Sequence, residues 1–229
     1  AAADGEEYVT ESFTLESGLV LRDVKVVYKT WGELNAAADN VIFVAHALTG
    51  NADAQGWWGG VIGPGLALDT DRFFVVCANI LGSCYGTTGP LEPLPAGGVP
   101  WASSARSPTR TDKQPRYAAD FPYVTVRDTV ALHREMLDSL GVRAVHAVVG
   151  GSLGGMQALE WLVMYPELVK RGVLIACSAF QSAWQIGISE TQRQAIYRDP
   201  KWRNGFYALD APRADGPAKS GRESGRDRV

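Results

Sequence analysis

The segment Gly150–Gly155, GGSLGG, contains the pattern G-x-S-x-G. It directly follows an apolar run, Val145–Val149, and opens a stretch with helical spacing. A nucleophilic serine on a strand-to-helix turn needs small neighbours, because the turn is strained and adjacent backbone passes close by. Gly150 and Gly154 supply that room. Ser152 is therefore the candidate nucleophile.

A glycine-rich turn of this kind can also bind a dinucleotide, form a Walker loop, hold a phosphate or merely pack. The dinucleotide-binding pattern G-x-G-x-x-G requires a glycine where Ser152 stands, and a Walker loop requires a lysine after the second glycine pair. Neither requirement is met. A turn that merely packs, or one that holds a phosphate, remains an alternative. The strand before it and the helix after it favour the nucleophile.

Two backbone N–H groups are candidates for stabilising an oxyanion beside Ser152. The Leu153 N–H lies at the N-terminal end of the expected helix, where free donors and the helix dipole favour negative charge. The second donor of such a site comes from the loop after an earlier strand, here His46–Gly50. We predict that Leu48 provides it. An ordinary strand-ending loop is the alternative.

A serine nucleophile also needs a histidine as general base and an acid that orients it. Where the serine lies on this kind of turn, both follow it in the chain, the acid first. The three histidines, His46, His133 and His146, all precede Ser152. We interpret His133 and His146 as core or edge residues and His46 as a residue that shapes the oxyanion loop. We therefore expect the triad Asp and His to be absent from this chain.

Cysteine and metal chemistry have weaker support. Cys84 lies in an irregular segment without a basic neighbour that would activate its thiol. No histidines and cysteines have metal-ligand spacing, so we predict no metal site. Three cysteines are too few for a disulfide framework, and Cys77 and Cys177 fall in apolar runs. This usage favours a reducing compartment, the cytoplasm.

The elements that must position Ser152 begin with five strand-like runs. Four of them are nearly continuous in apolar character, as in parallel strands covered on both faces, whereas the first mixes polar positions, as in an edge hairpin. The runs are Val24–Trp31, Val41–His46, Phe73–Asn79, Val145–Val149 and Val173–Cys177.

Helical patterns separate the later runs. Apolar residues recur at helical spacing from Val126 to Leu140, and Gly141 follows as a stop. A second apolar stripe begins at Met156 and ends before Tyr165-Pro166. The order strand, helix, strand, helix, strand predicts an α/β fold with a mostly parallel, doubly wound sheet and helices on both faces.

Size and charge agree with a small-molecule enzyme. The 229 residues allow one large domain or two small ones, and the 46% apolar content is typical of globular chains. A net charge of −3 offers no field for nucleic acid or an anionic membrane. The apolar runs are far shorter than the roughly 18 residues of a membrane span. The N-terminal AAADGEE lacks the pattern of a secretory signal and an initiator Met, so we expect no signal peptide and a chain that is processed or incomplete.

Three segments depart from the strand and helix alternation. Residues 82–122 hold seven prolines and five glycines and predict irregular surface structure beside the site. Residues 179–216, with helical potential near Glu190–Tyr197, predict the beginning of a helical lid over the core formed by residues 1–178. Residues 217–229 are a polar tail that we expect to be non-native or disordered.

Longer stretches resemble homoserine O-acetyltransferases. The resemblance covers about Tyr8 to Gly216 and is carried by four motifs: HALTG (46–50), GWWGGVIGPGLALDTDRFFVVCANILGSCYGTTGP (56–90), VVGGSLGGMQALEW (148–161) and RQAIYRDPKWRNGFY (193–207). Members of this family are α/β-hydrolase-fold acyltransferases of methionine biosynthesis, with a helical lid after the strand that here ends near Cys177.

The resemblance implies a ping-pong reaction. Ser152 would take the acetyl group from acetyl-CoA, a co-substrate rather than a permanently bound cofactor, and L-homoserine would then accept it. It also implies a homodimer. Transfer from succinyl-CoA, another hydroxylated acceptor, plain ester hydrolysis and a non-catalytic fragment are the alternatives.

The resemblance ends abruptly. After Gly216 the family continues with an apolar helix whose arginine binds the homoserine carboxylate, but glycine stands at the expected place, Gly221, and Arg222 falls one position late. We therefore expect the sheet to be incomplete at the C-terminus, and the chain to be truncated or frame-shifted there, with doubtful activity of its own.

Overall fold

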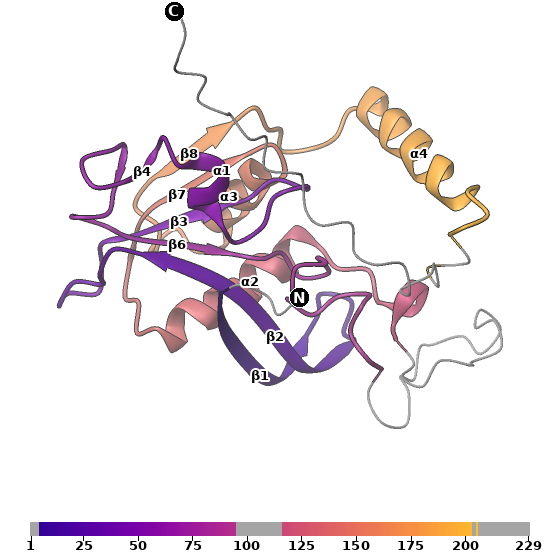
Figure 1. Ribbon diagram of the computed structural model, residues 1–229, viewed down its shortest axis with the longest axis horizontal. Coiled ribbons are helices and arrows are strands. Elements are labelled where there is room, and N and C mark those ends of the chain that lie inside the picture. The colour runs from indigo at the N-terminus through magenta and orange to yellow at the C-terminus, as the bar shows by residue number, and fades with distance from the viewer. Residues whose placement is uncertain (1–4, 95–115, 203–204, 206–229) are drawn as a thin grey trace, which may run out of the picture.

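The centre of the fold is a six-stranded sheet with the order β1-β2-β6-β3-β7-β8 (Figure 1). The computed structural model describes residues 5–94, 116–202 and 205. The neighbouring strands β6 and β3, β3 and β7, and β7 and β8 are parallel. Strand β2 is antiparallel to both β1 and β6. The strands are β1 (Glu6–Thr14), β2 (Val20–Trp31), β3 (Val41–Ala45), β6 (Phe74–Ala78), β7 (Val145–Gly151) and β8 (Gly172–Ile175).

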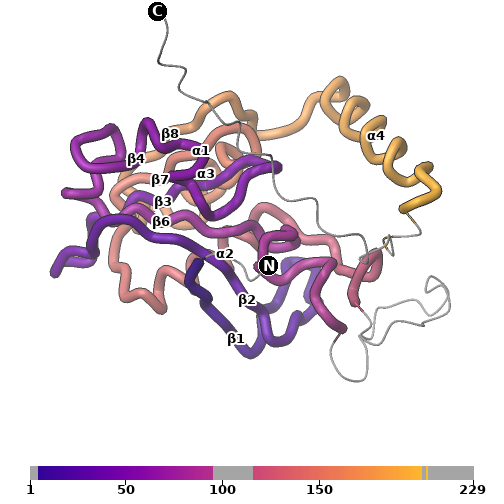
Figure 2. The backbone as a smooth tube through the Cα atoms, in the orientation of Figure 1, coloured from indigo at the N-terminus to yellow at the C-terminus, as the bar shows by residue number. Residues whose placement is uncertain are grey.

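Helices connect the parallel strands. Between β6 and β7 lies α2 (Val126–Ser139), and between β7 and β8 lies α3 (Leu153–Met164). Parallel neighbours require crossover connections of this kind. Figure 2 follows this path through the backbone. The remaining elements are α1 (Ala54–Trp58), the short pair β4 (Ile62–Gly63) and β5 (Leu68–Asp69), the 3₁₀ helix η1 (Ala118–Asp120) and α4 (Ala183–Tyr197).

The predicted mostly parallel α/β sheet is confirmed, and each of the five predicted strands is present. One strand of the six-stranded sheet, β1, was missed, as was the short pair β4 and β5. The sequence of β1, EEYVTESFT, is largely polar because most of its side chains are exposed. It pairs with β2 as an antiparallel hairpin, so β1 forms the edge of the sheet and β2 lies between β1 and β6.

The two faces of the sheet are covered differently. On one face, Phe43 and Val148 pack against residues of α2 and α3 such as Leu132 and Trp161. On the other face, the short helix α1 and the β4–β5 pair cover the strands. The core of that second face consists of Ile42, Val44, Ala54, Ile62, Leu68, Val75, Cys77, Ala147 and Val149. In the described residues, the long helices α2 and α3 therefore share one face.

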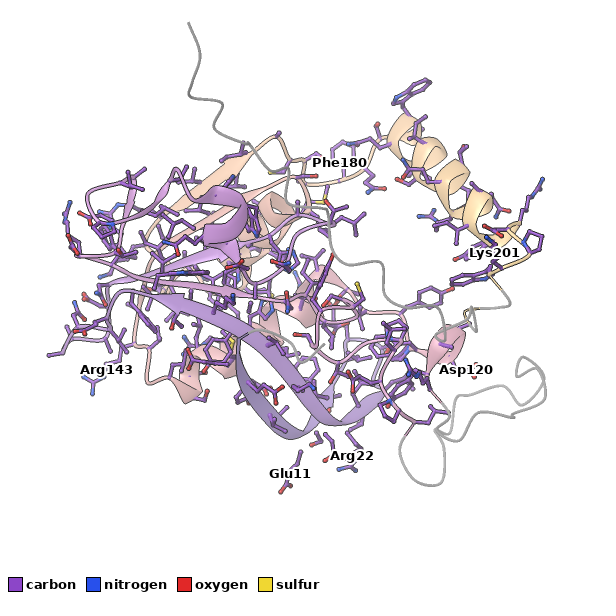
Figure 3. The ribbon with its side chains drawn as sticks, in the orientation of Figure 1. Glu11, Arg22, Asp120, Arg143, Phe180 and Lys201 are labelled. Carbon is purple, nitrogen blue, oxygen red and sulfur yellow. The ribbon has the colours of Figure 1, made fainter. Side chains whose placement is uncertain are left out.

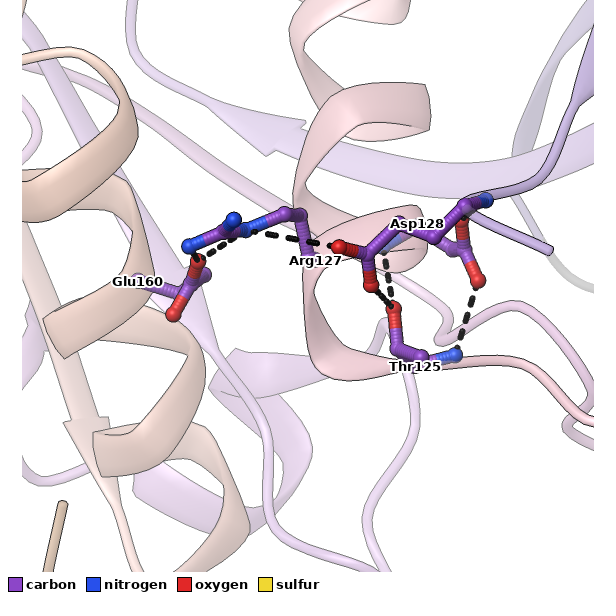
Figure 4. A network of polar contacts seen from close by, with 5 residues as sticks. Thr125, Arg127, Asp128 and Glu160 are labelled. Atoms are coloured by element: carbon purple, nitrogen blue, oxygen red, sulfur yellow. Dashed lines mark hydrogen bonds and ion pairs between the residues drawn. The ribbon is translucent and has the colours of Figure 1, made fainter.

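A polar network joins the start of α2 to its neighbours (Figure 4). The side chains of Thr125 and Asp128 form a reciprocal capping box. The Asp128 carboxylate also accepts from the Glu16 N–H, at 2.7 Å, in the β1–β2 turn. Arg127 pairs with Glu160 of α3 and with Glu16. The network therefore fixes α2 against α3 and against the hairpin.

Helix α4 stands apart from the sheet (Figure 1). It begins with a capping box at Ser182, and none of its side chains is buried. Figure 3 labels Phe180 and Lys201, which flank its two ends. No described helix has the length and apolar character that a membrane crossing requires.

Some predictions fall on residues that the structure does not describe. These are the tail 217–229, residues 203–204 and 206–216 of the expected lid, and the central part of the irregular segment, 95–115. The described remainder of that segment contains η1 and an isolated bridge between Pro93 and Arg116.

Candidate active site

Ser152 occupies a strained turn between β7 and α3. Its φ of 55° and ψ of −120° place a non-glycine residue in a region that L-residues rarely adopt. The Ser152 N–H donates to the Ile175 carbonyl of β8 at 3.0 Å, and its side chain is exposed. The turn therefore presents the hydroxyl at the carboxyl end of the sheet, directly before a helix N-terminus.

Two glycines make this turn sterically feasible. A Cβ at Gly150 would collide with the backbone carbonyl of Gly154, and a Cβ at Gly154 would collide with the carbonyl of Ala45. Neither obstacle is a flexible side chain, so neither can move aside cheaply. The turn from β7 into α3 therefore requires the absence of a side chain at Gly150, and the packing of α3 onto the end of β3 requires it at Gly154.

The loop that carries Leu48 leaves the sheet beside this turn. Ala45 on β3 lies opposite Gly150 on the parallel strand β7. The loop then turns tightly, with the Gly50 N–H donating to the Ala47 carbonyl at 2.9 Å. Leu48 is 77% exposed. Within the described part of the chain, no hydrogen bond uses the Leu48 N–H, so this donor is free for a ligand.

His46 is buried at the base of the loop, and both of its ring nitrogens bond to backbone. Nδ1 lies 2.8 Å from the Ala47 carbonyl oxygen and must be its donor, while Nε2 accepts from the Ile80 N–H at 3.3 Å. Burial lowers the pKa of the imidazole, so it is neutral at neutral pH. His46 therefore shapes the loop, as its sequence position indicated, and has no nitrogen left for the Ser152 proton.

The other two histidines also lie away from Ser152. His133 is fully buried in α2, where Nε2 donates to the Asn79 carbonyl at 3.1 Å and burial lowers its pKa to about 4. His146 is the second residue of β7. Along the extended strand, roughly 20 Å separates it from Ser152. Its ring packs on Phe73 with the centroids 4.7 Å apart. None of the three histidines therefore forms a hydrogen bond with Ser152.

Two buried amides that sequence reasoning missed join the elements around Ser152. Gln157 of α3 donates to the His46 carbonyl at 3.1 Å. Asn79, after β6, accepts from the Ala52 N–H at 2.7 Å and donates to the Tyr85 carbonyl at 2.8 Å. For either amide, the only signal in the sequence that could have pointed to this role is a polar residue inside an otherwise apolar stretch.

The cysteines do not form a reactive site at the turn. Cys77 is buried, and burial raises the pKa of its thiol. Cys177 lies against Gly155, where an added Cβ would meet the Cys177 Cβ at 2.6 Å. Cys84 is exposed on the loop after β6. Among the described residues, no three His, Cys, Asp or Glu side chains gather as metal ligands do.

The segment after β8 contains helix α4. It leaves β8 beside Ser152, forms α4, and reaches η1 on the far side, where a Cβ at Gly205 would lie 2.9 Å from the Ala119 backbone nitrogen. The loops after β3 and β6 end on the same side of the sheet as Ser152, because their strands are parallel. The described segment therefore begins at β8 and ends against η1, while α4 itself stands apart from the sheet.

A strained serine after a parallel strand, with a second loop beside it, defines an α/β hydrolase. The model of the alpha/beta hydrolase fold family matches residues 40–220, and the chain belongs to this family. The resemblance to homoserine O-acetyltransferases is confirmed at the level of sequence. The protein of that name from Nostoc punctiforme is 51% identical over 210 residues, and that from Trichormus variabilis is 49% identical over 206.

These relatives are longer than the chain. The matches cover 92% and 90% of the chain but 54% and 53% of the relatives, so the chain spans about half their length. Among solved structures, homoserine O-acetyltransferase from Bacillus anthracis has a TM-score of 0.78 at 30% identity, over 89% of this chain and 55% of that one. Esterase E22 has a TM-score of 0.76 at 32% identity, over 90% and 56%.

Proposed function

We propose that the enzyme to which these 229 residues belong is a homoserine O-acetyltransferase that works through an acetylated Ser152. The observation that carries the proposal is the strained Ser152 turn in a chain about half identical to curated proteins of that name. The substrates are acetyl-CoA and L-homoserine, and no cofactor stays bound. The proposal places the enzyme in the cytoplasm, as a homodimer, in methionine biosynthesis.

The chemistry consists of two acyl transfers. In the first, Ser152 Oγ attacks the thioester carbonyl, a C–O bond forms, the C–S bond breaks and coenzyme A leaves as the thiol with the proton that serine gave up. In the second, the homoserine hydroxyl attacks the acetyl ester, and its proton returns to Ser152 as O-acetyl-L-homoserine leaves. One difficult transfer becomes two easier ones.

Both tetrahedral intermediates carry an oxyanion. The Leu153 N–H, at the start of α3, and the Leu48 N–H, on the adjacent loop, are the proposed donors. Their support is the pairing of Ala45 with Gly150, which brings the loop and the helix start to the same level of the sheet. Loss of one donor of this kind typically costs about 10²–10³ in rate.

The proton of Ser152 needs a base that His46, His133 and His146 do not provide. Both nitrogens of His46 are bonded to backbone, and His133 and His146 lie elsewhere. We therefore propose that the histidine and its acid partner come from sequence beyond these 229 residues. Transfer to homoserine rather than to water also needs a cap. The segment that contains α4 is the proposed start of it.

The test uses the full gene product that contains this chain. We expect acetyl-CoA with homoserine to give O-acetylhomoserine, succinyl-CoA to react poorly, and mass spectrometry to find one acetyl group on Ser152 when homoserine is omitted. S152A should lose both product and label. If an active enzyme carries no acetyl group on Ser152, the acyl-enzyme mechanism is wrong. If the enzyme prefers succinyl-CoA, the proposal that acetyl-CoA is the acyl donor is wrong.

Ester hydrolysis is the second candidate, and the likeness to esterase E22 favours it. An esterase would release acetate from simple acetate esters whether or not homoserine is present. A transferase would partition the acetyl group toward homoserine as its concentration rises. The ratio of acetate to O-acetylhomoserine therefore separates the two activities in one experiment.

A further inference from the structure

Gln157 joins the helix that follows Ser152 to the loop that carries Leu48. It is 1% exposed and lies one turn after Leu153 on α3. Its Nε2 donates to the His46 carbonyl at 3.1 Å and approaches the Leu153 carbonyl at 3.5 Å. Its Oε1 is buried without a partner among the described residues. Burying an amide that is only half satisfied is unfavourable, and an apolar residue would avoid that cost.

His46 connects Gln157 to the residue that follows strand β6. Its carbonyl is held by Gln157, while its ring donates to Ala47 and accepts from Ile80, which follows β6. These three bonds act on one residue, two positions before Leu48. The first half of the loop is therefore tied to α3 on one side and to the end of β6 on the other.

Asn79 fixes the other end of the same loop. It accepts from the Ala52 N–H, donates to the Tyr85 carbonyl and offers its own carbonyl to His133. Leu48 lies between the two anchor points, His46 and Ala52, and is itself exposed. Between these anchors the Gly50 N–H donates to the Ala47 carbonyl, and Trp57 donates to the Asn51 carbonyl, so the loop around Leu48 is held on both sides.

We propose that Gln157 is a positioning residue that sets the spacing between the Leu48 and Leu153 N–H groups. This inference rests on the proposed function, because the two groups act together only as oxyanion donors. Helix α3 carries Leu153, and the Gln157 amide is the side-chain link from that helix to the other loop. Oxyanion donors act over a narrow range, about 2.7–3.1 Å from the oxygen, so a small shift of the loop weakens both half-reactions.

The test compares variants of the full gene product. Q157M keeps the shape of the side chain and removes the donor, and Q157E removes the donor while its carboxylate is ionised. W161F is the matched control, because Trp161 is equally buried on α3 and its Nε1 has no hydrogen-bond partner among the described residues. Thermal unfolding identifies a temperature at which all variants are folded.

We expect Q157M to lower kcat for acetylation and for transfer to homoserine by a similar factor, about 10–100-fold, with KM for acetyl-CoA within about twofold. W161F should keep its kcat. Q157E should regain activity as the pH falls, because a protonated carboxyl group donates to the His46 carbonyl again. Unchanged kcat in folded Q157M overturns the inference, as does an equal loss in W161F, which would indicate a purely structural role.

A failure of the proposed function has a different signature. In that case the wild type acetylates neither homoserine nor Ser152, whatever stands at position 157. Crystal structures of the wild type and Q157M then decide the positioning role alone. A shift of the Leu48 N–H relative to the Leu153 N–H supports it, and an unmoved loop overturns it.

Discussion

The Ala45 carbonyl lies where a side chain at Gly154 would have to stand. This one contact sets how closely the first turn of α3 approaches the end of β3. Ala45 also pairs with Gly150 on the neighbouring strand β7. Ala45, Gly150 and Gly154 therefore hold the Ser152 turn next to the loop that carries Leu48. Close backbone packing therefore brings the Ser152 turn and the Leu48 loop together, and the Gln157 side chain links them further.

Substitution of Gly154 by alanine tests this packing. The added methyl group meets backbone on the neighbouring strand, so either α3 or the loop must move. We expect G154A to lose roughly 1–3 kcal/mol of unfolding free energy, or more, and most of its activity. Chemical denaturation of the full gene product measures the first effect, and acetylation of Ser152 measures the second.

Gly187 provides the matched control. It also lies in a helix, α4, but an added Cβ there has no neighbour within 4 Å. G187A should be neutral or stabilising by roughly 0.5–1 kcal/mol, because glycine is the weaker helix former. If both variants are equally stable, the contact with Ala45 does not constrain the site.

The position of Ser152 could be predicted from the sequence because its signal is local. A serine between two glycines, after an apolar run and before a helical stripe, favours a nucleophile, and all parts of this pattern lie close to the serine in the chain. The loop after β3 could be predicted by the same reasoning. The strand β1 could not, because its mostly exposed side chains leave little apolar pattern.

Gln157 and Asn79 show what local patterns miss. The bond from Gln157 to His46 joins residues 111 positions apart, and that from Asn79 to Ala52 joins residues 27 apart. Such bonds depend on which strands are neighbours and on the register between them. A single polar letter in an apolar stretch gives no indication of its partner.

The cap of α2 provides a test of stability at a site that touches no candidate catalytic group. Thr125 accepts from the Asp128 N–H at 3.0 Å, and its own N–H donates to the Asp128 carboxylate at 2.9 Å. We expect T125A to lower the unfolding free energy by about 1 kcal/mol. T125S should keep the cap and most of the stability. A loss of kcat in T125A at a temperature where it is folded would contradict this separation.

The 229-residue chain, purified by itself, should form almost no O-acetylhomoserine. All three of its histidines are engaged elsewhere, so Ser152 has no base to take its proton. We expect product formation to be at the level of the S152A variant of the same chain, measured with acetyl-CoA and homoserine. Turnover clearly above that level would show that another group in the chain activates the serine.

The unfolding free energy should depend on pH through His133. Its pKa is about 4 in the folded protein against an ordinary value of 6.5. Between pH 6.5 and 4 the unfolded chain therefore binds a proton that the folded protein does not, and stability falls as the pH is lowered through this range. A shift of this size corresponds to on the order of 3 kcal/mol. His46, whose pKa is also lowered, acts in the same direction.

H133Q isolates this contribution, because a glutamine amide can still donate to the Asn79 carbonyl but does not titrate. Denaturation at several pH values should give a flatter profile for H133Q than for the wild type between pH 6.5 and 4. Carboxylates contribute equally to both proteins, so they cancel in the difference. Parallel profiles would mean that His133 takes up its proton without unfolding, through water reaching Nδ1, which has no partner among the described residues.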